Sequence, residues 1–147
     1  MANVTASLRG GTVATIRARQ FTWKADEPLS AGGTDEGPTP YEILLGSLAA
    51  CTTITLRLYA EHKGIALEGV DVELDFDRVH AEDCVDCDER ADGLIERIES
   101  RVVFHGTFDE PQKKRLAQVA QRCPVHKTLA QGVHIADTAS FEPGSSR

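Results

Sequence analysis

Two of the four cysteines lie where a thiol could take part in redox chemistry. Cys51 sits in the apolar stretch GPTPYEILLGSLAACTTITLRLYAEHKG, which runs from Gly37 to Gly64. Cys123 opens the segment CPVHK, where Pro124 ends one helical pattern and begins another. A helix N-terminus lowers the pKa of a thiol, so this position favours a thiolate at Cys123. Each cysteine also has a simpler interpretation, as a small core residue or a packing cap, because free cysteines are usually buried.

The other two cysteines, Cys84 and Cys87, form a C-x-x-C motif in an acidic segment, with His80 four residues before Cys84. A structural zinc site needs four ligands, usually from two such pairs, and the sequence offers one pair and a nearby histidine. A thioredoxin-like role is disfavoured because the surrounding carboxylates would raise the thiol pKa. Two hypotheses stay open: a solvated turn that carries two thiols, or a zinc-stabilised interaction module.

Glu42 is the acidic residue nearest to Cys51 in the apolar stretch, and it has a structural explanation. Thr39, Pro40 and Glu42 have the spacing of a capping box that starts a helix. At about 100° per residue, the separation of nine positions from Glu42 to Cys51 places the two side chains on opposite sides of that helix. Glu42 could therefore act only on another element or another subunit.

The alternation of side chains in an extended strand is expected to direct Arg17 and Arg19 toward the core. Both have the same parity as Phe21 and Trp23 in an extended chain. If the two aromatic side chains face the core, we expect the two arginines to point the same way.

The elements that must position these residues form an α+β pattern. Alternation on both sides of Gly10 and Gly11 predicts a hairpin, and strict alternation predicts a strand over 67–80. The segment over 94–106 is interpreted as a returning strand, although its Glu and Arg residues also suit a helix. Three- and four-residue spacing predicts a long, mostly buried helix from Thr39 to Gly64 and a second helix over 109–122. A short third helix over 124–132 and a last strand over 133–141 complete the pattern. The long helix has a predicted apolar stripe of Leu44, Leu48, Cys51, Thr55 and Leu58.

Length, charge and cysteine usage limit the class of protein. The 147 residues suit one domain over 1–141 followed by a flexible tail over 142–147. A net charge of −7 argues against nucleic acid or an anionic membrane as a partner. The N-terminus lacks the apolar region of a signal peptide, and no apolar run is long enough to span a membrane. Four cysteines without a signal peptide indicate a reducing compartment, the cytoplasm.

The two cysteine segments together resemble those of the OsmC/Ohr family of thiol-dependent peroxidases. The apolar stretch around Cys51 is followed about seventy residues later by RCPVHKTL, and the likeness extends from the first hairpin to VHIADTASF. ADEP, GPTP and RVHAEDCVDC place the chain nearest to the broad OsmC-like branch. The resemblance implies an interlaced homodimer in which antiparallel sheets wrap around central helices.

The resemblance also implies site residues. Cys51 would be the peroxidatic thiol and Cys123 the resolving thiol, with an organic hydroperoxide as substrate and an external dithiol as reductant. No metal, flavin or nicotinamide would be required. The family's glutamate falls at Tyr41, one residue before Glu42, and Arg17 is preferred over Arg19 as the assisting arginine. The alternative is an OsmC-like protein that binds or senses a small electrophile or lipid in the dimer cavity.

Overall fold

The computed structural model describes residues 1–80 and 93–144, and these form an α+β structure with antiparallel sheets, as predicted. One sheet has three strands in the order β1-β2-β3, and the other is a long two-stranded hairpin of β4 and β5. The elements are β1 (Thr5–Ser7), β2 (Ala14–Ala18), β3 (Phe21–Ala25), the 3-10 helix η1 (Leu29–Ala31), α1 (Pro40–Lys63), β4 (Leu67–His80), β5 (Leu94–Gly106), α2 (Glu110–Ala120) and α3 (Pro124–Gln131).

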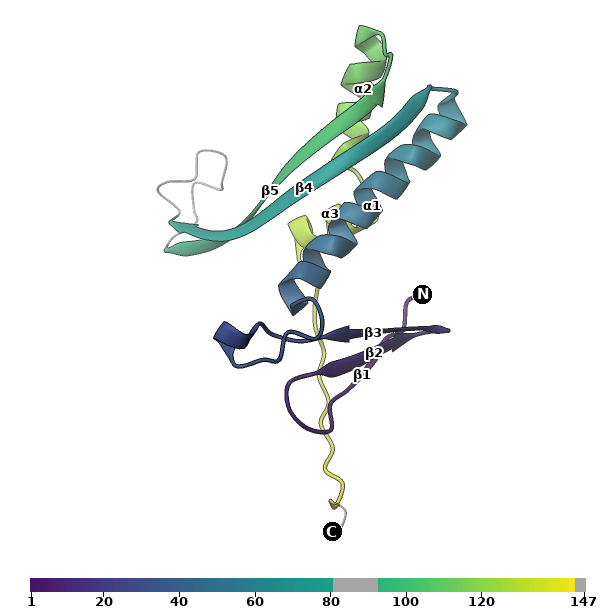
Figure 1. Cartoon of the computed structure of the whole chain (residues 1–147). Helices are drawn as coiled ribbons and strands as arrows, with labels where there is room; N and C mark the ends of the chain where they lie inside the picture. Colours follow the sequence, from purple (N-terminus) through teal and green to yellow (C-terminus); the bar gives the residue numbers. More distant parts are fainter. Residues whose placement is uncertain (81–92, 145–147) are drawn as a thin grey trace.

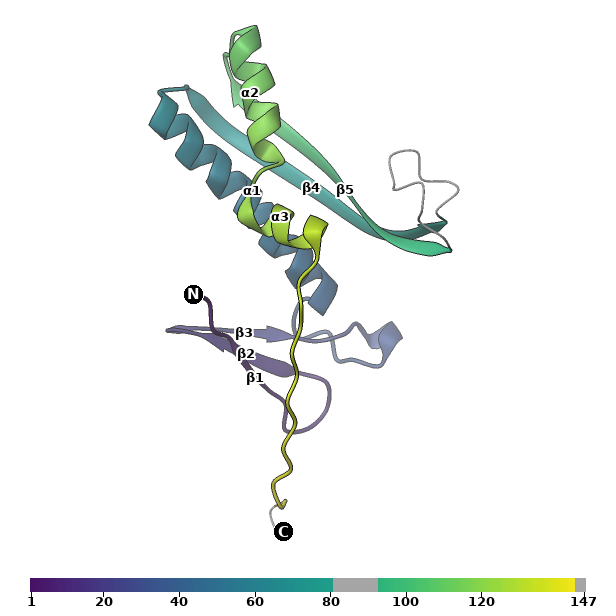
Figure 2. The same ribbon diagram turned by 180° about the vertical axis from the view of Figure 1, so that it is seen from behind.

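The long helix α1 runs alongside the β4–β5 hairpin (Figure 1). The helices α2 and α3 follow on the side of the hairpin seen in Figure 2, and both contact α1. The three-stranded sheet lies at the N-terminal end of α1, away from the hairpin (Figure 1). Within the chain, the hairpin therefore lies along α1, whereas the three-stranded sheet lies beyond the start of that helix (Figure 1).

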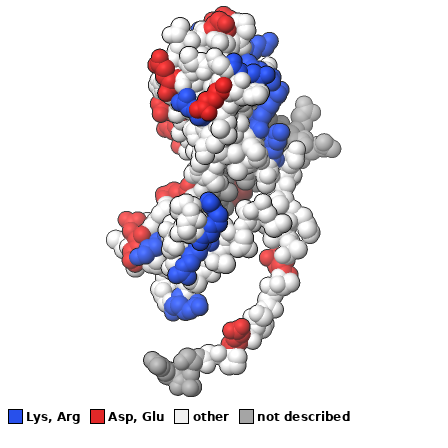
Figure 3. Space-filling model, turned by 90° about the vertical axis from the view of Figure 1, so that its right-hand side faces the viewer, with Lys and Arg blue, Asp and Glu red and all other residues white. Residues whose placement is uncertain are grey.

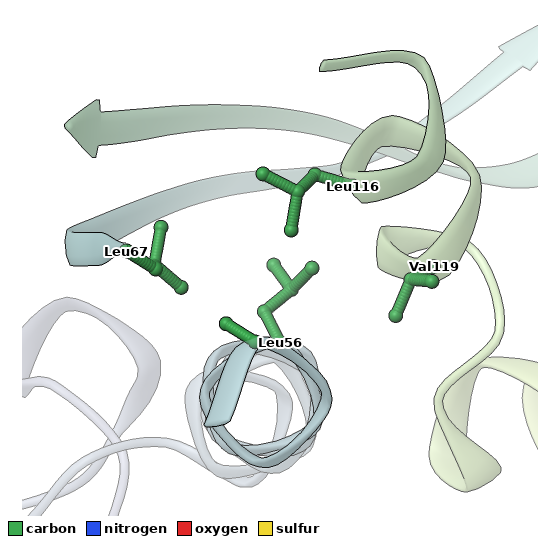
Figure 4. Close-up of a cluster of buried hydrophobic side chains, with 5 residues drawn as sticks. Leu56, Leu67, Leu116 and Val119 are labelled. Carbon is green, nitrogen blue, oxygen red and sulfur yellow. The ribbon is translucent and has the colours of Figure 1, made fainter. Parts of the chain in front are cut away.

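The hydrophobic core lies where α1, β4 and α2 meet. Leu56 from α1 points between Leu67 of β4 and the pair Leu116 and Val119 of α2 (Figure 4). Leu56 and Leu116 are fully buried, and Ala60 lets the neighbouring elements approach the helix closely. This small cluster anchors the C-terminal half of α1, and the cysteine-bearing turn lies before it along the helix.

A capping box starts α1, as the sequence predicts. The Glu42 backbone N–H donates to Thr39 Oγ1 at 3.2 Å, and the Thr39 backbone N–H donates to Glu42 Oε2 at 3.1 Å. Gly64 ends the helix with a φ of 66°, a left-handed conformation that glycine adopts without a steric penalty. The helix therefore has a fixed start and end, which sets the direction of every side chain on it.

The buried side of α1 differs from the predicted stripe. The buried residues recur every four positions, at Leu48, Thr52, Leu56 and Ala60. Cys51 is half-buried beside this line, whereas Leu58 lies on the open side with 60% of its surface exposed. The prediction of a mostly buried helix is therefore wrong for this chain, because only one side of α1 is covered.

By length and composition alone, α1 is apolar enough to cross a membrane, which contradicts the prediction that no run is long enough. Such helices also occur in the interiors of globular proteins. Here α1 packs against β4, α2 and α3 through its buried side.

The β4–β5 hairpin has one apolar and one polar face, as predicted. Along β4, Val70 and Val72 are half-buried and alternate with exposed Asp71 and Glu73. On the polar face, the Arg101 side chain of β5 forms ion pairs with Glu73 and Asp75 of β4, both at 3.1 Å. The turn with Cys84 and Cys87 lies outside the described residues.

The N-terminal sheet corrects the predicted direction of the arginines. A tight turn at Arg19, with a φ of 52°, separates β2 from β3, so the extended pattern does not continue from Arg17 to Trp23. Ile16 pairs with Trp23 and shares its face, whereas Arg17 pairs with Thr22 on the opposite face. Arg17 is exposed, and the Arg19 guanidinium lies 5.0 Å from the centre of the Phe21 ring.

The predicted last strand does not form within this chain. Residues 133–144 belong to no helix or strand and extend away from the helices (Figures 1 and 2). Their apolar side chains are exposed, from 68% at Val133 and 70% at Ile135 to 95% at Phe141. The alternating pattern is present, but no neighbouring strand in this chain pairs with it.

Candidate thiol active site

The structure brings Cys51 and Cys123 together from two helices. Cys51 lies midway along α1, and Cys123 is the N-cap of α3. The Cys51 side chain lies close enough to Cys123 to raise the pKa of the Cys123 thiol, and both thiols are free. Cys123 is completely buried and Cys51 is half-buried, so the two residues differ in their access to solvent.

The Cys123 sulfur accepts a backbone hydrogen bond because of its N-cap position. The His126 N–H donates to Cys123 Sγ at 3.3 Å, in the way that a serine or aspartate side chain caps a helix. Pro124 occupies the first helical position, where its missing N–H costs nothing. The sequence CPVH thus directs an N–H donor at the sulfur.

Thr52 is a second polar neighbour of Cys123. Its hydroxyl oxygen lies 3.7 Å from Cys123 Sγ, and its hydroxyl donates to the Leu48 carbonyl at 2.9 Å. Thr52 is itself buried, with 4% of its surface exposed. Helical spacing already places Thr52 on the apolar side of the helix, four residues after Leu48, but nothing in the local sequence indicates a contact with Cys123.

Burial raises the pKa of the Cys123 thiol above its ordinary value. The His126 N–H and the Thr52 hydroxyl act in the opposite direction, whereas the adjacent Cys51 side chain adds to the rise. The predicted lowering by the helix N-terminus is therefore wrong in sign, because desolvation outweighs it. Cys123 is held as a neutral thiol in the reduced protein.

A groove with both polar and apolar walls lies next to two neighbours of Cys123. It encloses about 480 Å³, and Thr52 and His126, the two neighbours of Cys123, are part of its wall. A second hollow of about 270 Å³ shares Leu48, Ile98, Ser100 and His126 with it and continues toward Leu129. The groove is lined by Leu48, Thr52, Ile98, Ser100, Val102, Phe104, Ala117, Ala120, Gln121 and His126.

Glu42 and Arg17 lie elsewhere in the described part of this chain. The Glu42 carboxylate is engaged in the capping box at the start of α1. Arg17 is on the three-stranded sheet beyond that end of the helix (Figure 1). Tyr41, where the family's glutamate would fall, stacks on Phe76 of β4 with ring centres 4.6 Å apart. This chain alone brings neither charged group to the thiol pair.

No cluster of three or more metal-ligating side chains occurs among residues 1–80 and 93–144. The hypothesis of a zinc module rests on Cys84 and Cys87, which are outside those residues. His80 ends β4, and its side chain is not described.

Comparisons with solved structures agree with this architecture. The OsmC-like protein from Mycoplasma pneumoniae is 28% identical, with a TM-score of 0.65 over 90% of this chain and 89% of that chain. The organic hydroperoxide resistance protein OhrB of Bacillus subtilis is 23% identical, with a TM-score of 0.56 over 87% of this chain and 89% of its own. The organic hydroperoxide resistance protein OsmC from Legionella pneumophila is 17% identical, with a TM-score of 0.62 over 88% of each chain.

A search of curated proteins gave no match. The family model of OsmC-like proteins matches residues 33–136, a range that contains α1, the hairpin, α2, α3 and both cysteines of the pair. The chain therefore belongs to the OsmC-like protein family.

Proposed function

We propose that the protein is a thiol-dependent peroxidase that reduces organic hydroperoxides through Cys51 and Cys123. The observation that carries the proposal is the proximity of a half-buried cysteine on α1 to a buried cysteine at the start of α3, close enough for Cys51 to raise the pKa of the Cys123 thiol. Two neighbouring thiols that differ in exposure suit a reaction in which one meets the peroxide and the other forms a disulfide with it. Two solved structures of the same fold carry names that refer to organic hydroperoxide resistance, which supports this class of substrate.

The reaction consists of three balanced steps. The Cys51 thiol loses its proton, the thiolate attacks the distal oxygen of the hydroperoxide, and the O–O bond breaks to give Cys51 sulfenic acid and an alkoxide, which takes up a proton from water and leaves as an alcohol. The Cys123 thiol then condenses with the sulfenic acid, which gives the Cys51–Cys123 disulfide and water. An external dithiol reduces that disulfide by thiol–disulfide exchange and becomes oxidised itself.

The groove supports an organic rather than an inorganic peroxide as substrate. One part of its wall is aliphatic and aromatic, with Ile98, Val102 and Phe104 from the apolar face of β5. An alkyl or aryl group placed there would gain from burial, by about 25 cal/mol for each Å² of apolar surface removed from water. Hydrogen peroxide has no such group and would gain nothing.

We propose a cytoplasmic homodimer as the active form. The exposed side of α1 and the unpaired, alternating segment over 133–141 are the features that a second copy would cover. In such a dimer, Arg17 and Glu42 would assist the Cys51 thiolate from across the interface, since each is distant from Cys51 within its own chain. Residues 1–141 would form the single domain of each subunit.

The test follows thiol oxidation in the reduced protein. A slight excess of cumene hydroperoxide, with hydrogen peroxide in a parallel reaction, should consume two thiols per chain and yield the linked Cys51 and Cys123 peptides in mass spectrometry. Cys51→Ser should abolish the fast reaction, and Cys123→Ser should stop it at a sulfenic acid that dimedone traps. Cys84→Ser/Cys87→Ser is the matched control and should react like the wild type.

Slow thiol loss spread over all four cysteines, or confined to Cys84 and Cys87, would contradict the peroxidase proposal. The engagement of Glu42 in the helix cap favours one alternative in that case, an OsmC-like protein that binds or senses a small electrophile or lipid. Alkylation of Cys51 alone by a small electrophile, without turnover of hydroperoxide, would support it.

A further inference from the structure

We propose that Thr52 is a positioning residue that makes Cys123 the leaving group when the Cys51–Cys123 disulfide is reduced. The proposal rests on the proposed function for its biological setting, but the chemistry requires only the disulfide. Its basis is the set of contacts around Cys123 Sγ.

The accessibility of the two sulfurs decides where a reductant attacks. Cys123 has no exposed surface, whereas Cys51 is half-buried at the edge of the covered side of α1. A thiolate from solution therefore reaches Cys51 Sγ. The S–S bond breaks, its electron pair leaves on Cys123 Sγ, and the reductant becomes joined to Cys51 in a mixed disulfide. The second thiol of the reductant then releases Cys51 and closes the oxidised dithiol.

The rate of such an exchange depends on how well the leaving sulfur carries negative charge. Burial disfavours a thiolate at Cys123, so the donors directed at that sulfur must offset part of the cost. One donor is the His126 N–H, at 3.3 Å, and it is fixed by the first turn of α3. The other is the Thr52 hydroxyl, with its oxygen 3.7 Å from the sulfur.

The Thr52 hydroxyl can serve both protonation states of Cys123. In the reduced protein it donates to the Leu48 carbonyl, so its oxygen is available to accept the Cys123 S–H. When Cys123 leaves as a thiolate, rotation of the hydroxyl turns its hydrogen toward the sulfur. The same rotation would stabilise Cys123 as a nucleophile when the disulfide forms.

The other titratable groups at this sulfur are Cys51 from α1 and His126 from α3 itself. Cys51 is consumed in the mixed disulfide, and His126 contributes its backbone N–H to Cys123 Sγ. Replacing Thr52 therefore removes the side-chain donor to Cys123 Sγ and leaves the backbone donor in place. The change in reduction rate then reports the contribution of the Thr52 hydroxyl alone.

The experiment uses full-length protein in a Cys84→Ser/Cys87→Ser background. Diamide forms the Cys51–Cys123 disulfide, so the measurement does not depend on any hydroperoxide. After removal of diamide, excess dithiothreitol is added, and acid-quenched samples are alkylated and analysed by mass spectrometry. Thr52→Val should slow reduction about fivefold to tenfold, the effect expected for one hydrogen bond to a charged sulfur.

Three controls separate the hydroxyl from packing. Thr52→Ser should keep the background rate, and Thr52→Ala should be slow, although both lack the methyl group. Thr53→Val removes a comparable hydroxyl, one that donates to the Ala50 carbonyl at 3.0 Å, and should not slow the reaction. In a further Cys51→Ser background, ultraviolet titration of the thiolate should give a higher Cys123 pKa for Thr52→Val than for Thr52→Ser.

Equal reduction rates for Thr52→Val and the background would overturn the proposal. So would equal slowing by Thr52→Ser and Thr52→Ala, or slowing by Thr53→Val as large as that by Thr52→Val. Disulfide formation with diamide but not with cumene hydroperoxide would count against the peroxidase proposal alone. If diamide failed to link Cys51 to Cys123, both proposals would fall.

Discussion

At the scale of single residues, Asp26 is the most densely hydrogen-bonded side chain described. Its carboxylate accepts the hydroxyls of Thr12 and Thr34, both at 2.6 Å, and the backbone N–H groups of Glu27, Thr34 and Glu36. These donors hold the pKa of Asp26 well below its usual range. The Asp26 backbone N–H also donates to the Pro38 carbonyl at 3.2 Å, so the residue ties the end of β3 to the start of α1.

Asp26→Asn should lower the melting temperature by roughly 5–10 °C, because the new amide would direct its own N–H groups at existing donors. The folded-state pKa lies below that of an unfolded aspartate, about 3.9, so the stabilisation is complete above that pH and is lost as the pH falls further. Thermal unfolding at pH 7 and pH 3, at one protein concentration, checks both statements. Equal acid sensitivity of Asp26→Asn and the wild type would contradict the assignment of that loss to Asp26. Asp35→Asn, an exposed aspartate of the same loop, is the control.

The sequence singles out Cys51 and Cys123 as candidate site residues but does not describe their surroundings. Their segments carry helix-start and helix-interior signals that can be interpreted locally. Their contact, the burial of Cys123 and the approach of Thr52 depend on how α1 and α3 cross, which local patterns do not encode. Desolvation is a property of the packed structure, and this is why the pKa shift of Cys123 was predicted with the wrong sign.

At the scale of elements, the stability of the site depends on how α1 is anchored. Leu56 is fully buried among β4 and α2, one turn after Thr52 (Figure 4). Leu56→Ala should cost about 2–5 kcal/mol of unfolding free energy, measured by urea denaturation. Leu29→Ala, at a position that is 75% exposed, should cost less than about 0.5 kcal/mol. A similar loss for both variants would show that the cluster does not anchor the helix.

The three helices and the β4–β5 hairpin were predictable because each carries its own periodicity and start or stop signals. The turn between β2 and β3 was missed because Arg19 occupies a left-handed conformation that glycine or asparagine usually signals. The last strand was predicted from the segment VHIADTASF at 133–141. Its absence here has a physical reason, since a strand forms only against another strand.

At the scale of the whole molecule, large hydrophobic side chains are exposed on several elements. On the face in Figure 3, a broad band without Lys, Arg, Asp or Glu separates two charged regions, and the C-terminal segment leaves as a thin arm. Ile54 and Leu58 of α1 are 57% and 60% exposed. Surfaces of this kind usually mark a site of association.

The proposed dimer predicts that Leu58→Asp and a truncation after Gly132 each weaken association. A charge would be buried in the interface in the first case, and the unpaired strand would be missing in the second. Light scattering after size exclusion should give twice the chain mass of 16.0 kDa for the wild type and a smaller mass for each variant at low concentration. Lys114→Asp, an exposed change on α2, is the charge control. A wild-type protein that runs as a monomer would refute this assembly.

The network around Asp26 has a further consequence for the entropy of assembly. A free loop between β3 and α1 would let the three-stranded sheet take many orientations, and association would have to suppress them. With the loop fastened to one carboxylate and to Pro38, much of that ordering is already complete in the folded chain. The sheet would then meet its partner preorganised, and each protonation of Asp26 in acid would return some of that lost freedom.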